Sequence, residues 1–154
     1  MLFIPGFVIA ILTFPGVIVH EAAHRFFCDL AHVPVYDVCY FRIGNPSGYV
    51  VHGHTKSLRA SFLITIGPLL INTLLCAVIC FAPAISLSLN VANAPIVFVL
   101  LGWLGLSIGM HAFPSPQDAA NFSAVVRSSG RGLLYVVARM FQALVWLAHL
   151  LRMI

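Results

Sequence analysis

Four long apolar stretches dominate the sequence and constrain the fold more than any other feature. They cover approximately residues 2–27, 58–82, 95–112 and 133–151. A helix needs about 20 mostly apolar residues to cross a bilayer, so these stretches predict an all-α integral membrane protein with about four transmembrane helices. The chain is 61% hydrophobic and only 8% charged, which is too apolar for the surface of a soluble domain. We therefore expect one membrane-embedded domain over residues 1–154.

A different pattern fills the connection between the first two stretches. Residues 35–43 are rich in β-branched and aromatic side chains, residues 44–48 are turn formers, and strand character resumes at residue 49. This order predicts a β-hairpin over about residues 35–54. His52 and His54 would share one face of its second strand, either as solvated side chains or as a second metal or regulatory site.

The pentapeptide His20-Glu21-Ala22-Ala23-His24 ends the first apolar stretch. Residues four apart share one helix face, so the two histidines can bind the same metal ion. The glutamate beside them is placed to accept a proton from water activated by that metal, as in the HExxH motif of zinc hydrolases. Glu21 is the only glutamate in the chain. The alternative is a polar helix end that is merely solvated.

A catalytic zinc needs a third protein ligand. Asp118 and His111 are the main candidates, and Asp118 is favoured by charge and position. Asp29 and Asp37 lie in the hairpin connection, where acidic residues are commonly solvated. Asp118 also has a structural explanation. Ser115 followed by proline predicts a helix N-terminus, at which a carboxylate in the third position stabilises the first turn.

Positive charges predict the orientation in the membrane. Six of the eight lysine and arginine residues lie at the connections between the first and second stretches and between the third and fourth: Arg25, Arg42, Lys56, Arg59, Arg127 and Arg131. Arg139 lies within the fourth stretch, and Arg152 at its end is a minor exception. The positive-inside rule makes both connections cytoplasmic. The HEAAH motif, His111 and Asp118 then lie together on the cytoplasmic side of a multi-pass protein.

The second apolar stretch carries Gly67-Pro68 and Asn72, which are costly in lipid and should face protein or water. An HExxH motif in a first membrane helix, with Gly-Pro and Asn in the next, resembles the site-2 protease family. Members of this family are intramembrane zinc metalloproteases that cut transmembrane segments of other proteins. The HEAAH motif matches the family pattern without departure, whereas the Gly-Pro and Asn pattern has one extra residue.

The segment from residue 111 to 118 resembles the second signature of this family, which supplies the third zinc ligand. Pro114 and Pro116 match its two prolines, and Asp118 matches its aspartate. His111 stands in place of the family asparagine, the residues flanking the aspartate differ, and the spacing is one residue shorter. His111 therefore stays open as a ligand or as a group that polarises the scissile carbonyl.

The resemblance implies hydrolysis of peptide bonds in or near transmembrane segments, with Zn²⁺ held by His20, His24 and Asp118 and with Glu21 as general base. Asn72 would donate to the substrate backbone or the developing oxyanion, or else form a helix–helix hydrogen bond. The hairpin edge would hold an unwound substrate strand.

Two other functions stay open: a metal-binding membrane protein without protease activity, and an inactive interaction subunit of the same fold. The expected partners are the lipid bilayer and a transmembrane protein or peptide substrate, with a second copy of the chain or a regulatory membrane partner left open. No basic patch interleaved with aromatic residues suggests nucleic acid.

Overall fold

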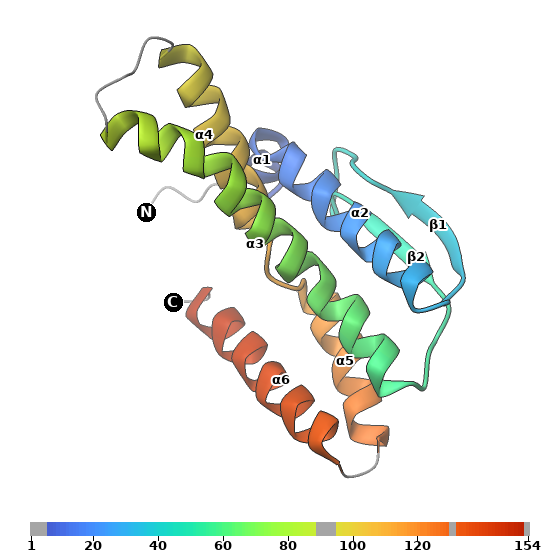
Figure 1. The fold of residues 1–154 in the computed structure, drawn as a ribbon. Helices are drawn as coiled ribbons and strands as arrows, with labels where there is room; N and C mark the ends of the chain where they lie inside the picture. The colour runs from blue at the N-terminus through green and yellow to red at the C-terminus, as the bar shows by residue number, and fades with distance from the viewer. Residues whose placement is uncertain (1–5, 89–94, 130–131, 153–154) are drawn as a thin grey trace.

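Six helices and one two-stranded hairpin make up the described part of the chain, which comprises residues 6–88, 95–129 and 132–152 of a computed structural model (Figure 1). The elements are α1 (Gly6–Leu12), α2 (Phe14–Leu30), β1 (Val35–Cys39), β2 (Tyr49–His52), α3 (Leu58–Ser88), α4 (Pro95–Met110), α5 (Pro116–Ser128) and α6 (Leu133–Arg152). This confirms the predicted mostly helical fold and the hairpin after the first apolar stretch.

Within the described residues, α3 alone is both long and apolar enough to cross a membrane, over Leu58–Phe81. Its 31 residues correspond to about 46 Å at the helical rise of about 1.5 Å per residue. The apolar parts of α4 and α6, Ile96–Met110 and Leu133–Leu147, are shorter. One such helix is weak evidence for a membrane protein, so the expected four spans stay a prediction.

The first apolar stretch forms two helices rather than the single helix expected over residues 2–27, of which residues 1–5 lie outside the described part. The break falls at Thr13, just before Pro15, which has no backbone N–H to donate. Ser107 of α4 satisfies the exposed backbone: its hydroxyl donates to the Thr13 carbonyl at 2.9 Å and accepts from the Gly16 N–H at 3.0 Å. The break is therefore stabilised by α4, a contact that local sequence does not reveal.

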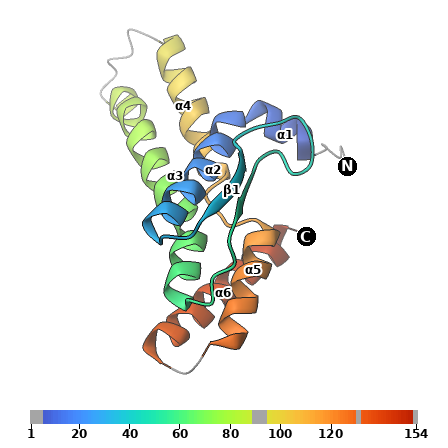
Figure 2. The ribbon, with the colours of Figure 1, turned by 90° about the vertical axis from the view of Figure 1, so that its right-hand side faces the viewer.

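α3 and α4 lie side by side and pack through glycines (Figures 1 and 2). A Cβ atom added to Gly109 would lie 2.8 Å from the sulfur of Cys76, and one added to Gly105 would collide with the sulfur of Cys80. Gly105 and Gly109 therefore allow α3 and α4 to pack closely. Gly102 on the same helix faces open space, with no atom within 4 Å of its added Cβ.

We expect Gly105→Ala to destabilise the fold by about 1–3 kcal/mol, the usual cost of overpacking a filled interface. This cost exceeds the gain of up to about 1 kcal/mol that alanine brings to a helix. Gly102→Ala is the matched control and should leave stability unchanged or raise it. Thermal unfolding of both variants measures the difference, and equal melting temperatures would contradict the packing assigned to α3 and α4.

The hairpin is antiparallel and packs against α2 (Figure 2). Val38 pairs with Val50 and Cys39 with Tyr49, and the register shifts between Val35 and Asp37. The strands are shorter than the predicted 35–54 but fall within it. The turn before β2 lies beside the part of α2 that carries the HEAAH motif, since a Cβ atom added to Gly48 would lie 2.8 Å from Cγ of Glu21.

Candidate metal centre

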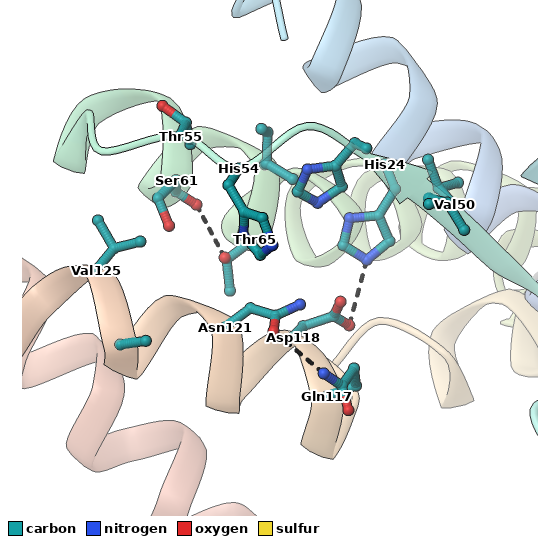
Figure 3. Close-up of a pocket in the computed structure, with 14 residues that line it drawn as sticks. His24, Val50, His54, Thr55, Ser61, Thr65, Gln117, Asp118, Asn121 and Val125 are labelled. Carbon is teal, nitrogen blue, oxygen red and sulfur yellow. Dashed lines mark hydrogen bonds and ion pairs between the residues drawn. The ribbon is translucent and has the colours of Figure 1, made fainter. Parts of the chain in front are cut away.

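Two helices that are distant in sequence place three metal-binding side chains together. His20 and His24 come from α2 and Asp118 comes from α5, and their ligand atoms all lie within 4.8 Å of one another. Oδ2 of Asp118 lies 3.3 Å from Nε2 of His24 and 3.7 Å from Nε2 of His20. Figure 3 shows His24 and Asp118 pointing towards each other. These are the three ligands that the sequence favoured.

The α2 helix continues without interruption through the HEAAH motif, so the two histidines lie one turn apart on one face. Both are buried, with 7% of His20 and 5% of His24 exposed. Nδ1 of His20 lies 2.6 Å from the carbonyl oxygen of His111. A carbonyl can only accept, so Nδ1 carries the proton and Nε2 is left as a lone pair for a metal.

Asp118 is positioned by the start of α5. Ser115 is the N-cap, and its hydroxyl accepts from the Asp118 N–H at 3.2 Å. In return, Oδ2 of Asp118 accepts from the N–H of Ser115 at 2.8 Å and from its hydroxyl at 2.7 Å. The predicted cap at Ser115 is confirmed. Capping and metal binding are therefore not alternatives for Asp118, because the same carboxylate oxygen serves the cap and faces both histidines.

The electrostatic surroundings keep Asp118 ionised. Burial by itself would raise the pKa of this carboxyl, but its proximity to the imidazoles of His24 and His20 outweighs burial and holds the pKa well below its usual range. Nε2 of His24 is buried and makes no hydrogen bond within the described residues, although it lies 3.3 Å from Oδ2 of Asp118. An anionic oxygen that faces two imidazole nitrogens fits a divalent metal ion, which would bind all three groups at once.

Glu21 lies in the same cavity as the histidines but is not part of the ligand group. It is 8% exposed, and the hairpin turn covers it. A Cβ atom added to Gly48 would lie 2.8 Å from Cγ of Glu21 and 3.0 Å from Val17. The contact between Gly48 and Glu21 could not be predicted from the sequence, because nothing in a turn-rich segment indicates which helix the turn will contact.

The other candidate ligands lie elsewhere. Nδ1 of the His111 ring is 3.0 Å from the carbonyl oxygen of Ser107, and His111 is not in the ligand group although it lines the cavity. Asp29 accepts from Arg25 at 2.9 Å, and Asp37 accepts from the Tyr49 hydroxyl at 2.9 Å. The backbone carbonyl of His111, rather than its ring, contacts the centre.

Asn72 is fully buried at the α3–α4 interface. Its side-chain amide donates to the carbonyl oxygens of Ile108 at 3.2 Å and His111 at 3.1 Å, which is the helix–helix alternative of the sequence analysis. The same His111 carbonyl accepts from His20. Asn72 does not line either of the two cavities described below, so contact with substrate stays a prediction.

Two cavities meet at the ligand group, between β2 and α5. The larger has a volume of about 690 Å³ and contains both histidines and Glu21. The smaller has a volume of about 380 Å³ and is lined by His52 and His54. Figure 3 shows this cavity, with His54 labelled. Six residues line both cavities: His24, Val50, His52, Gln117, Asp118 and Asn121. In the described part of the chain, His52 and His54 belong to no group of three metal ligands.

Ser115→Ala should weaken metal binding, because the hydrogen bonds that orient a ligand are typically worth a factor of about 10–100 in affinity. It should also cost about 1 kcal/mol of stability through the lost cap. Competition with a zinc chelator measures the affinity. Ser128→Ala, at the exposed far end of α5, is the control. Equal zinc affinity in both variants would contradict the positioning role of Ser115.

Comparison with protein-family models, with curated proteins and with solved structures finds no match. The fold and the site define a mostly helical chain with a buried group of two histidines and one aspartate that can hold a metal ion.

Proposed function

We propose that the protein is an intramembrane zinc metalloprotease that hydrolyses peptide bonds in or near the transmembrane segments of other proteins. The observation that carries this proposal is the convergence of His20, His24 and Asp118 in a cavity that also contains Glu21. A site that only stores or carries a metal has no need of an additional buried carboxylate beside the ligands.

Zinc fits this ligand set, since two imidazole nitrogens and one carboxylate oxygen form a catalytic zinc site when the fourth position is open. The 690 Å³ cavity adjoining the three ligands leaves room at that position. When bound, zinc supplies a Lewis acid that polarises a carbonyl group and lowers the pKa of water.

The protein groups complete the reaction. Glu21 accepts a proton from the attacking water, whose oxygen bonds to the peptide carbonyl carbon. The carbon–nitrogen bond then breaks, and Glu21 returns the proton to the leaving amine. His20 is held in orientation by its hydrogen bond to the His111 carbonyl, and Asp118 by Ser115.

The substrate must present an extended backbone, because a helix satisfies its own peptide groups internally. Residues of β2 line both cavities, so a substrate strand added along the hairpin would pass the metal group. The length and apolar character of α3 support placement in a membrane, and the positive residues support a multi-pass arrangement with the site towards the cytoplasm.

The test uses protein purified in detergent without chelators and a synthetic peptide with an Ala/Leu segment of about 20 residues, the length of a membrane span. Mass spectrometry should find internal cleavage that stops with a zinc chelator and returns with added zinc. Cleavage that continues in the chelator would contradict the proposal. Bound zinc without cleavage of this peptide would instead favour a non-proteolytic metal-binding membrane protein.

A further inference from the structure

The C-terminal end of α4 packs against both α2 and α3 and contacts α2 at two places (Figure 2). Ser107 bonds to the backbone on both sides of the break at Thr13, and a Cβ atom added to Gly16 would collide with the Ser107 carbonyl oxygen. About one turn further along the chain, the His111 carbonyl oxygen lies 2.6 Å from Nδ1 of His20 and accepts its proton. The end of α4 is therefore the support against which His20 is oriented.

Asn72 of α3 holds this end of α4 in place. A helix leaves its last backbone carbonyls without partners of its own, and Pro114, further along the chain, has no N–H to offer. The side-chain Nδ2 of Asn72 donates to the carbonyl oxygen of Ile108 at 3.2 Å and to that of His111 at 3.1 Å. The Ile108 carbonyl also accepts from the His111 N–H at 3.2 Å. Asn72 therefore fixes the same His111 carbonyl that accepts from His20.

The chemistry of the Asn72 amide permits only one orientation. The reverse orientation would set its oxygen against two carbonyl oxygens, and all three of these atoms are acceptors. Asn72 is fully buried in an apolar helix, and its Oδ1 makes no hydrogen bond within the described residues. Such a buried polar group costs stability, and an apolar side chain of similar size would avoid that cost. The two N–H groups of Asn72 therefore indicate a role beyond packing.

We propose that Asn72 is a positioning residue of the metal centre, which raises the zinc affinity by fixing the carbonyl that orients His20. The contacts run from the Asn72 amide to the His111 carbonyl and on to Nδ1 of His20, whose Nε2 then faces Asp118 at 3.7 Å. Asn72 lines neither cavity, so it acts through His111 rather than by touching substrate. The inference rests on the zinc site of the proposed function but not on peptide cleavage.

Zinc titration in competition with a chelator, with no peptide present, tests the inference. Asn72→Leu keeps the size of the side chain but removes both donors. Zinc should then bind about 10–100-fold more weakly, the typical effect of losing a hydrogen bond that orients a ligand. Asn72→Ser is a second variant that introduces no apolar side chain. Its hydroxyl should bond within its own helix, as that of Thr65 does to the Ser61 carbonyl at 2.9 Å, so it should weaken zinc binding as well.

Gly105→Ala is the matched control, because it disturbs the same α3–α4 interface at Cys80, away from the His111 carbonyl. It should lower the melting temperature of the metal-free protein and still bind zinc as the wild type does. If Asn72 only stabilised the interface, the zinc affinity of each variant would follow its melting temperature. An equal loss of zinc affinity in Gly105→Ala and Asn72→Leu would therefore overturn the inference.

Cobalt(II) gives a spectroscopic measure of the same site. It accepts the same nitrogen and oxygen ligands as zinc, and its visible absorption depends on their geometry. Protein saturated with cobalt should show a changed spectrum in Asn72→Leu, because His20 is no longer held in orientation, and the wild-type spectrum in Gly105→Ala. A wild-type spectrum in Asn72→Leu would overturn the inference.

Cleavage assays on the same preparations separate this inference from the proposed function. Asn72→Leu protein that binds zinc as tightly as the wild type but cleaves peptide slowly would overturn the positioning role. The protease would stand, with Asn72 as a donor to the substrate. A loss of zinc affinity in Asn72→Leu, together with wild-type protein that binds zinc but cleaves no peptide, would overturn the protease and support the positioning role.

Discussion

Glu21→Gln should abolish peptide hydrolysis while leaving bound zinc in place. The glutamine has the same size but cannot accept a proton, so we expect a loss of about 10²–10⁴-fold in rate, the usual contribution of a general base. Zinc should stay because Glu21 is not part of the ligand group of His20, His24 and Asp118. Mass spectrometry measures the rate of peptide cleavage, and the zinc content of the same preparation shows whether the metal stays bound.

Asp29→Asn is the control for loss of a carboxylate. Asp29 lies on the same helix but is exposed and pairs with Arg25, so its variant should retain both activity and zinc. A Glu21→Gln protein that cleaves at the wild-type rate would remove the general base from the mechanism. A variant that loses its zinc would instead make Glu21 part of the metal site.

Asp118→Asn should remove most of the zinc affinity without removing the helix cap. The asparagine oxygen can still accept from the Ser115 N–H, as Oδ2 of Asp118 does at 2.8 Å, but the negative charge beside the two histidines is gone. Because Asp118 is itself a ligand in this account, the loss should exceed the 10–100-fold typical of a supporting hydrogen bond. Zinc titration in competition with a chelator measures it.

His111→Ala separates the two candidates for the third ligand. The variant keeps the backbone carbonyl that accepts from His20 and loses only a ring that lies outside the ligand group. We expect it to retain zinc. If His111→Ala lost its zinc and Asp118→Asn kept it, the third ligand would be His111. That result would contradict a ligand group made of His20, His24 and Asp118.

Features set by local spacing could be predicted from the sequence. The HEAAH motif places two histidines on one face because any α-helix places residues four apart together. Ser115, with proline after it and an acid three residues on, predicts a helix start from local hydrogen bonding alone. The positions of the positive residues independently predict that the HEAAH motif and the helix start at Ser115 lie at the same depth in a membrane.

Features set by contacts between distant segments could not be predicted. The break at Thr13 depends on the hydroxyl of Ser107, 94 residues away in the chain. The covering of Glu21 by Gly48 depends on how the hairpin docks on α2. Asn72 was expected to contact substrate or another helix, and its hydrogen bonds to the Ile108 and His111 carbonyls follow only from the position of α4 opposite it.

X-ray absorption at the zinc edge of wild-type protein, purified without chelators, tests the central claim most directly. We predict one zinc per chain with two imidazole nitrogens at about 2.0–2.1 Å and a carboxylate oxygen at about 2.0–2.2 Å. A shell of three imidazoles, scattering from sulfur at about 2.3 Å, or protein without zinc would contradict a centre built from His20, His24 and Asp118.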